Sequence, residues 1–116
     1  MRSRKDQLEA VERLLEIIDN LRENCPWDRK QTFQSLRHLT IEETYELGDA
    51  ILENDYGEIK KELGDLLLHI IFYANIGSEK IVLDIVDIAN HISEKVIEIH
   101  PNPSDVHIVC SYAIAR

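Results

Sequence analysis

Two acidic motifs have the residue types and the spacing to do chemistry. The first has the form E-E-x-x-E and begins at Glu42, and the second has the form E-x-x-D and begins at Glu62. Residues three or four positions apart share one face of a helix. Glu43 and Glu46 therefore point in the same direction if the first motif is helical. Glu62 and Asp65 do the same in the second motif.

The distance between the motifs lets the two acidic pairs face each other. In an antiparallel helix hairpin, two residues at the same height are equally far from the turn. Glu46 and Glu62 satisfy this condition for a turn at Asn54. Glu43 and Asp65 satisfy it for the same turn. We therefore expect four carboxylates from two helices to meet at one place.

Four carboxylates at one place form a strongly negative site, because they repel each other and raise one another's pKa values. A divalent cation removes this conflict. Ligands that are all oxygen atoms suit Mg²⁺, with Mn²⁺ as a possible substitute, rather than Zn²⁺. Such an ion can bridge phosphate oxygens and activate water. Glu42, four residues before Glu46, could reach the edge of the site as a catalytic base or as a ligand of a second metal.

A plainer interpretation is that the acidic residues are the solvated faces of acidic helices. Two features favour a metal site over this alternative. The two acidic pairs share one register, and each pair lies among apolar residues. These apolar neighbours are Ile41, Tyr45, Leu47, Leu63, Leu66 and Leu67.

The size and charge of the chain limit its classes of function. It has 116 residues, the size of one domain, and a formal net charge of −9. Nucleic-acid backbones and anionic membranes repel a protein of this charge. We therefore expect neither nucleic acid nor membrane as a partner, and a cation must mediate any contact with phosphates.

The termini and cysteines suggest a cytoplasmic protein. A charged helical pattern, not an apolar signal core, follows the N-terminal methionine. No apolar run approaches the ~20 residues of a membrane span. Cys25 and Cys110 lack the spacing of a metal site or a disulfide framework, so we expect reduced thiols.

Helical periodicity dominates the chain and predicts an all-α fold. Thr40 and Glu43 have the spacing of a capping box, which predicts that a helix starts at Thr40. Gly77 and Ser78 are expected to end the following helix. The tail at 106–110 alternates weakly and could be a short strand. The predicted helices are 5–22, 41–53, 58–76 and 84–99, with a short helical turn at 32–37.

We predict a four-helix bundle-like domain in which the central antiparallel hairpin binds metal. The 58–76 helix is apolar around nearly its whole circumference. A helix of this kind needs cover on every side, which a chain of this size can hardly supply. We therefore expect oligomerisation to complete the bundle.

Several motifs, taken together, resemble the MazG family. The resemblance runs from about residue 14 to residue 101. Any one of the motifs would be a weak signal, but the combination is specific. Besides the two acidic motifs, the matching segments are Cys25-Pro26-Trp27-Asp28, Gln31-Thr32, Ser35-Leu36, Asp49-Ala50-Ile51, Phe72-Tyr73-Ala74, Asp87, Lys95 and His100-Pro101.

The resemblance implies a helical nucleoside triphosphate pyrophosphohydrolase that works as a homodimer or a dimer of dimers. Water would attack the α-phosphorus of an NTP or dNTP, and pyrophosphate would leave the nucleoside monophosphate. Such an enzyme would serve nucleotide-pool house-cleaning. The resemblance carries over four Mg²⁺ ligands, which are Glu43, Glu46, Glu62 and Asp65.

Three further side chains are candidates for binding the substrate. Trp27 offers a flat face on which a base could stack, although it could instead plug the core at a helix end. Arg29 matches a basic position of the family and could meet a phosphate, or it could be a solvated surface cation. Lys95 stands where the family carries a phosphate-contacting lysine, with a plain surface lysine as the alternative.

The C-terminal part departs from the family pattern. Ile99 stands where the family carries an arginine, and residues 102–116 form an atypical tail within a single domain of residues 1–116. An alternative function is therefore a catalytically impaired acidic helical module that binds another protein. The complete set of carboxylates argues against it, since an inactive module need not keep all four.

Overall fold

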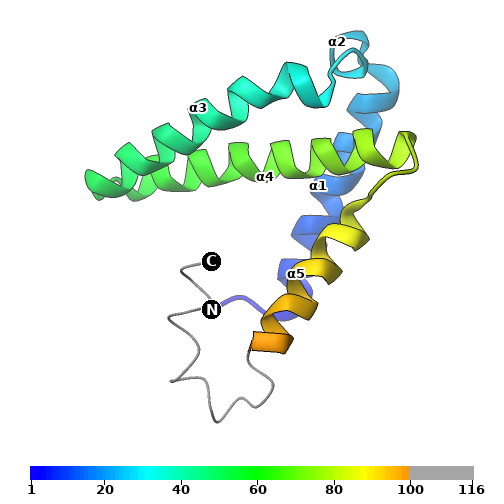
Figure 1. Cartoon of the computed structure of the whole chain (residues 1–116). Coiled ribbons are helices and arrows are strands. Elements are labelled where there is room, and N and C mark those ends of the chain that lie inside the picture. Colours follow the sequence, from blue (N-terminus) through cyan, green and yellow to red (C-terminus); the bar gives the residue numbers. More distant parts are fainter. Residues whose placement is uncertain (100–116) are drawn as a thin grey trace.

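Five helices form the fold in the computed structural model, which describes residues 1–99. The all-α prediction is confirmed, and residues 1–99 contain no strand. Helices α3 and α4 lie side by side as an antiparallel hairpin, α1 crosses α4, and α5 leads away from the end of α4 (Figure 1). The helices are α1 (Arg4–Asn24), α2 (Pro26–Arg29), α3 (Phe33–Leu52), α4 (Tyr56–Glu79) and α5 (Ile85–Ile99).

The prediction that a helix starts at Thr40 is wrong. Helix α3 is continuous, and its capping box lies one segment earlier, where Thr32 and Ser35 cap each other's backbone N–H groups. The Thr40 hydroxyl instead donates to the carbonyl of Leu36, 3.2 Å away. The predicted turn at 32–37 and the predicted helix at 41–53 are therefore one helix.

The hairpin turns where the register predicts. Asn54 has φ of 55°, in the left-handed region that asparagine tolerates better than most residues. Asp55 then caps α4, because its side chain accepts a hydrogen bond from the backbone N–H of Glu58. This turn sets the heights at which residues of α3 and α4 face each other.

Helix α4 does not end at Gly77 and Ser78 as the sequence predicts, but continues to Glu79. Gly77 is buried in the helix, and the backbone of the following loop packs directly against it. A Cβ atom at Gly77 would lie 2.9 Å from the carbonyl oxygen of Leu83. The glycine therefore serves close packing and does not stop the helix.

Gly77→Ala is expected to lower the free energy of unfolding by about 1–2 kcal/mol. Overpacking costs about 1–3 kcal/mol, and the better helix propensity of alanine offsets part of that loss. Urea denaturation measures the change. Gly48→Ala is the matched control, because a Cβ atom there meets nothing within 4 Å. Equal effects of the two variants would contradict the packing role of Gly77.

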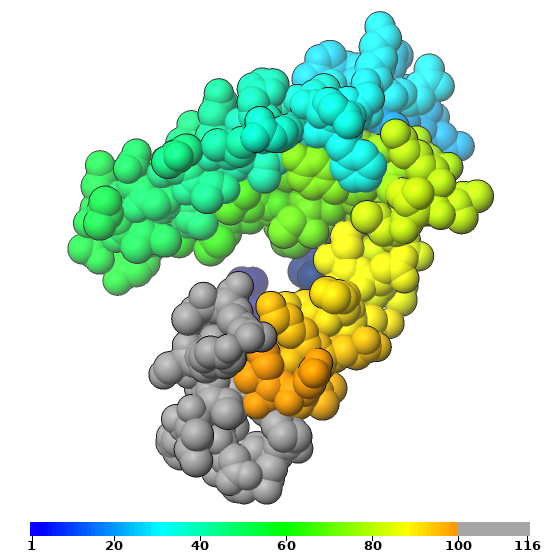
Figure 2. Space-filling view, in the orientation of Figure 1, coloured from blue at the N-terminus to red at the C-terminus, as the bar shows by residue number. Residues whose placement is uncertain are grey.

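The hydrophobic core occupies only one end of the hairpin. It joins α1, the start of α3 and the second half of α4. The turn end of the hairpin, drawn in green, stands clear of the other helices in the space-filling view (Figure 2). A single chain therefore does not close a four-helix bundle. The buried core residues are Ile18, Leu36, Ile71, Phe72 and Ile76.

Two further expectations from the sequence concern a membrane span and the C-terminal tail. Among residues 1–99, no helix combines the length and the apolar character that a membrane span requires. The atypical tail at 102–116 and the possible strand at 106–110 lie outside the described residues.

Candidate metal centre

Three of the predicted carboxylates converge between α3 and α4. Glu43 comes from α3, and Glu62 and Asp65 come from one face of α4. Each of the three offers a carboxylate oxygen, and these atoms all lie within 4.8 Å of one another. Equal distances from the turn at Asn54 therefore bring together three of the four carboxylates that were predicted to meet, and Glu46 lies outside this close group.

The carboxylates are withdrawn from water. Glu62 is only 2% exposed, and Glu43 and Asp65 are half-buried. One oxygen of Glu43 and one of Glu62 (Oε2 in each) are buried without a hydrogen-bond partner. A cation also stands nearby, since the Nζ atom of Lys61 lies 3.9 Å from Oε1 of Glu62. It is 64% exposed and leaves the two Oε2 atoms unpaired.

The crowding shifts the protonation of the site. The pKa of Glu43 is raised to about 8, first by hydrogen bonding to the Glu62 carboxyl group, then by burial and by the charges of Asp65 and Glu46. Hydrogen bonding to Glu62 is also the main cause that raises the pKa of Glu46. A shared proton is thus one way to satisfy the buried oxygens.

A divalent cation could also satisfy the buried carboxylate oxygens, and the donor atoms present suit such an ion. All the donors are carboxylate oxygens, which are the ligands that Mg²⁺ and Mn²⁺ prefer. Two unpaired, buried oxygens are costly unless a proton or a cation meets them. Residues 43, 62 and 65 therefore form a site suited to a hard divalent metal.

Known proteins resemble this chain in sequence. A family described as the MazG nucleotide pyrophosphohydrolase domain matches residues 31–104. The chain belongs to this family. The match includes both acidic motifs and therefore the whole α3–α4 hairpin.

Curated relatives of this MazG domain are longer proteins. The nucleoside triphosphate pyrophosphohydrolase of Escherichia coli strain K12 is 42% identical over 98 residues, which cover 82% of this chain and 37% of that protein. The nucleoside triphosphate pyrophosphohydrolase/pyrophosphatase MazG of Thermotoga maritima is 45% identical over 93 residues, which cover 78% of this chain and 36% of that protein. The chain thus matches little more than a third of either relative.

A solved structure agrees with the fold of this MazG domain. The crystal structure of a mazG-related protein from Thermotoga maritima matches with a TM-score of 0.71 at 23% sequence identity. The match covers 90% of this chain and 99% of that one. It supports the helical architecture.

The remaining predicted acidic residues of the MazG domain lie outside the close group of three. Glu46 stands beside Glu62 in the wall of a neighbouring hollow of about 360 Å³. Asp49, Glu53 and Glu58 line the same hollow, so negative charge extends from the carboxylate group toward the turn. Glu42 is exposed and does not belong to the three converging carboxylates.

The three predicted substrate-binding residues occupy different parts of the MazG domain. Trp27 is 65% exposed and lines a cavity of about 140 Å³, so it is not a core plug within the chain. Arg29 is exposed on α2. Lys95 is half-buried on α5, which leads away from the hairpin (Figure 1). Within one chain, the structure does not bring Lys95 to the carboxylates.

Sequence reasoning missed a polar network next to the carboxylates of the MazG domain. The hydroxyl of Thr40 lies 3.0 Å from Nδ1 of His69 and 2.6 Å from the hydroxyl of Tyr73. Thr40 belongs to α3, and the other two residues lie four positions apart on α4. The spacing of His69 and Tyr73 was the available signal. The missing information was which residue of α3 faces them.

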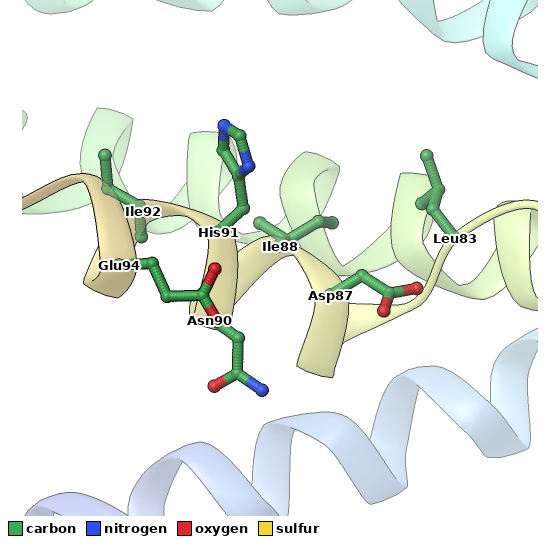
Figure 3. A pocket seen from close by; sticks show the side chains of 7 residues that line it. All are labelled: Leu83, Asp87, Ile88, Asn90, His91, Ile92 and Glu94. Atoms are coloured by element: carbon green, nitrogen blue, oxygen red, sulfur yellow. The ribbon is translucent and has the colours of Figure 1, made fainter.

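A hollow of the MazG domain also lies along α5, away from the carboxylates. It measures about 760 Å³ and is lined by Leu83 and by residues of α5. His91 and Asn90 point to different sides of this helix (Figure 3). Among residues 1–99, the lining of this hollow does not include the three converging carboxylates. We therefore place the candidate site at the hairpin.

The raised pKa of Glu43 predicts how stability depends on pH without metal. An unfolded chain releases this proton near pH 4.3, whereas the folded chain keeps it to about pH 8. The free energy of unfolding should therefore fall as pH rises toward about 8. Above that value the Glu43 contribution no longer changes.

Thermal melting in EDTA between about pH 6.5 and pH 9 measures this effect. The lower limit avoids His69, whose pKa is lowered by burial and whose protonation opposes folding in acid. Saturating Mg²⁺ should flatten the profile, because a bound cation replaces the proton. A metal-free melting temperature that rises through this range would contradict the prediction.

Proposed function

We propose that this MazG domain hydrolyses nucleoside triphosphates, NTP or dNTP, to nucleoside monophosphate and pyrophosphate with Mg²⁺. The observation that carries the proposal is the convergence of Glu43, Glu62 and Asp65, with two buried oxygens that no protein donor satisfies. Glu46, beside Glu62, completes the proposed ligand set. Mn²⁺ has the same ligand preference and is a possible substitute.

Some residues of the chain would hold the metal, and others would position the attacking water and the nucleotide. The metal, when bound, would supply charge neutralisation for the phosphates and a more acidic water. Glu42, at the exposed edge of the motif, is the proposed base that receives the proton of the attacking water. Arg29 and Lys95 are the proposed contacts for phosphate oxygens, and Trp27 is the proposed contact for the base.

Charge supports a small-molecule substrate over a nucleic acid. A net charge of −9 repels a polyanion, whereas a single triphosphate can arrive with its own Mg²⁺. We infer a house-cleaning role in the nucleotide pool and, from two cysteines without a disulfide framework, a cytoplasmic location. Both are proposals about the protein's setting in the cell.

Release of pyrophosphate from a panel of NTPs and dNTPs tests the function. Each nucleotide is incubated with the chain in Mg²⁺, in Mn²⁺ and in EDTA, and both products are separated. The proposal expects equal amounts of monophosphate and pyrophosphate with either metal and none in EDTA. Release of inorganic phosphate and a diphosphate instead would contradict attack at the α-phosphorus.

We propose that the domain forms a homodimer or a dimer of dimers. Exposed apolar side chains occur on every helix, including Leu8 on α1, Leu63 on α4 and Ile97 on α5, which are 61%, 51% and 65% exposed. The hairpin also stands clear of the other helices near its turn (Figure 2). A second copy of the chain would cover such surfaces.

Light scattering coupled to size-exclusion chromatography should give the mass of two or four chains at micromolar concentration. Leu63→Glu should shift the mass toward one chain, because it places a charge on the surface to be buried. Glu94→Gln, an exposed change on α5, is the control. A monodisperse wild-type monomer would refute the proposal.

A further inference from the structure

Residues 25–31, here called the α2 segment, carry two of the proposed substrate contacts, yet burial does not fix them. None of these residues is buried. Helix α2 has only four residues, and no side chain caps its N-terminus. Trp27 is 65% exposed, and Arg29 is also exposed. Contacts from outside must therefore set the orientation of the α2 segment.

Arg22, near the end of α1, contacts the backbone of the α2 segment. Nη1 of its guanidinium donates to the carbonyl of Asp28 at 2.7 Å and to the carbonyl of Gln31 at 2.9 Å. Among residues 1–99, no other side chain from outside the segment donates to one of its carbonyls. Ser35 of α3 reaches the segment through the Gln31 side chain, at 2.8 Å. Arg22 therefore connects the backbone of the α2 segment to α1.

The end of α4 fixes the other edge of the same guanidinium. Nε and Nη2 donate to the two carboxylate oxygens of Glu79, at 2.6 and 2.9 Å. Paired contacts of this kind fix the direction of the planar group as well as its distance. The guanidinium also lies 5.9 Å from the ring centroid of Phe72, which is buried. Arg22 is thus held from α4 while it holds the α2 segment.

The chemistry of this contact favours a role in geometry. Removing an ion pair from water offsets much of its attraction, so apolar residues could join these segments at a similar net stability. A planar guanidinium, in contrast, fixes two carbonyls and one carboxylate in a single arrangement. Hydrogen bonding to Arg22 is also the main cause that lowers the pKa of Glu79, so this carboxylate stays charged at neutral pH.

We propose that Arg22 is a positioning residue for the nucleotide, because its guanidinium sets the orientation of the α2 segment and thereby of Trp27 and Arg29. Arg22 acts through these two side chains and does not itself contact the nucleotide. The inference rests on the proposed function for the substrate and for the roles of Trp27 and Arg29. It adds the residue that couples both contacts to the end of α4.

A positioning role and a purely structural role change different kinetic constants. Loss of a structural anchor lowers the fraction of folded enzyme, so the apparent kcat falls and KM stays the same. Misplaced Trp27 and Arg29 would bind the nucleotide more weakly in every folded molecule, so KM rises. The carboxylates remain in place, so kcat and the Mg²⁺ concentration for half-maximal activity should stay close to wild type.

Arg22→Lys and Glu79→Gln test the proposal in the full chain. Arg22→Lys should raise KM about five- to tenfold, roughly the effect of one hydrogen bond. Glu79→Gln should raise KM by less, since one acceptor oxygen remains. Among the described residues, the Glu79 side chain hydrogen-bonds to Arg22 alone. Glu79→Gln should therefore add little to KM when Arg22→Lys is already present.

Two control variants separate geometry from stability and from charge. Ile18→Val lowers stability by removing a methyl group from a fully buried side chain. Glu9→Gln breaks an exposed ion pair with Lys5 on α1. Both variants should keep the wild-type KM.

Fluorescence anisotropy of Trp27, the single tryptophan of the chain, reports on the α2 segment without any nucleotide. Arg22→Lys should lower the anisotropy, because a less restrained segment lets the indole ring reorient. Ile18→Val and Glu9→Gln should leave it unchanged. A structural loss elsewhere in the domain would not produce this difference.

The outcomes for the inference and for the proposed function differ. Unchanged KM and anisotropy in Arg22→Lys would overturn the inference and leave the proposed function standing. An equal rise of KM in Ile18→Val would also overturn it, since lost stability would then explain the effect. Failure of the proposed function would appear as a wild type that releases no pyrophosphate. The affinities of wild type and Arg22→Lys for ATP in Mg²⁺, titrated by Trp27 fluorescence, then decide the inference.

Discussion

Glu62→Gln is expected to lower pyrophosphate release at least about a hundredfold. The change removes one charge from the most buried carboxylate of the site and weakens metal binding there. A catalytic metal contributes several kcal/mol to its reaction, and each 1.4 kcal/mol is tenfold in rate. Initial rates at saturating nucleotide and increasing Mg²⁺ measure the loss.

The same substitution should stabilise the metal-free protein. Glu62 lies with Glu43 and Asp65 inside 4.8 Å, and its removal relieves their mutual repulsion. Wild type should gain stability on adding Mg²⁺, about 2.7 kcal/mol at one hundred times the dissociation constant, and the variant should gain much less. Glu16→Gln, an exposed change on α1, controls for loss of charge elsewhere. A variant that stays active, or that melts earlier without metal, would contradict the ligand role.

Arg22→Ala is expected to lower the free energy of unfolding by about 2–4 kcal/mol. The guanidinium donates two hydrogen bonds to the carboxylate of Glu79, at 2.6 and 2.9 Å, and two more to the carbonyls of Asp28 and Gln31, at 2.7 and 2.9 Å. Its side chain is 13% exposed and stands over the ring of Phe72. Hydrogen bonds to charged groups contribute about 1.5–3 kcal/mol, and the freed carbonyls add to the loss.

Two variants divide the Arg22 contribution into charge and geometry. Arg22→Lys keeps the charge, but a lysine ammonium group cannot contact Glu79 and both carbonyls at once as the planar guanidinium does. Arg22→Lys should therefore retain only part of the stability that Arg22→Ala loses. Glu79→Gln should cost less than Arg22→Ala, because Glu79 is half-exposed. Urea denaturation at one protein concentration compares all three. A fully stable Arg22→Lys would show that the planar guanidinium is not needed.

The register of the site was predictable because it depends only on the chain geometry of two straight helices. Equal distances from Asn54 placed Glu43 opposite Asp65 and Glu46 opposite Glu62 before any contact was known. Helical spacing then put each pair on one face. No other information was needed to bring Glu43, Glu62 and Asp65 within 4.8 Å.

The errors arose where tertiary contacts overrode local patterns. Thr40 and Glu43 match a capping box, but Thr40 lies inside a helix because its hydroxyl also meets His69 and Tyr73 across the hairpin. Gly77 looks like a helix end, but it is the small residue that the backbone of Leu83 requires. In both cases the deciding partner is close in space but lies outside the local sequence pattern.

Arg22 shows a second limit of sequence reasoning. In the sequence it is one of several charged residues on the first helix, with nothing to distinguish it from its neighbours. Its importance comes from carbonyls of the loop after α1 and from Glu79, fifty-seven positions away. Backbone carbonyls are the same for every residue type, so the sequence does not indicate which of them accept hydrogen bonds from Arg22. The role of Arg22 could be found only from the structure.

The hydrophobic core and the carboxylates occupy different halves of α4, so the two halves should differ in local stability. The core residues Ile71, Phe72 and Ile76 hold the second half of α4, whereas Glu62 and Asp65 lie nearer the turn. Native-state hydrogen exchange should therefore divide this helix, with amides near the turn exchanging through local opening and those of the core through global unfolding. Repulsion between the carboxylates then strains the half that can open alone. Evolution can alter the charges of that half while the rest of the domain stays folded.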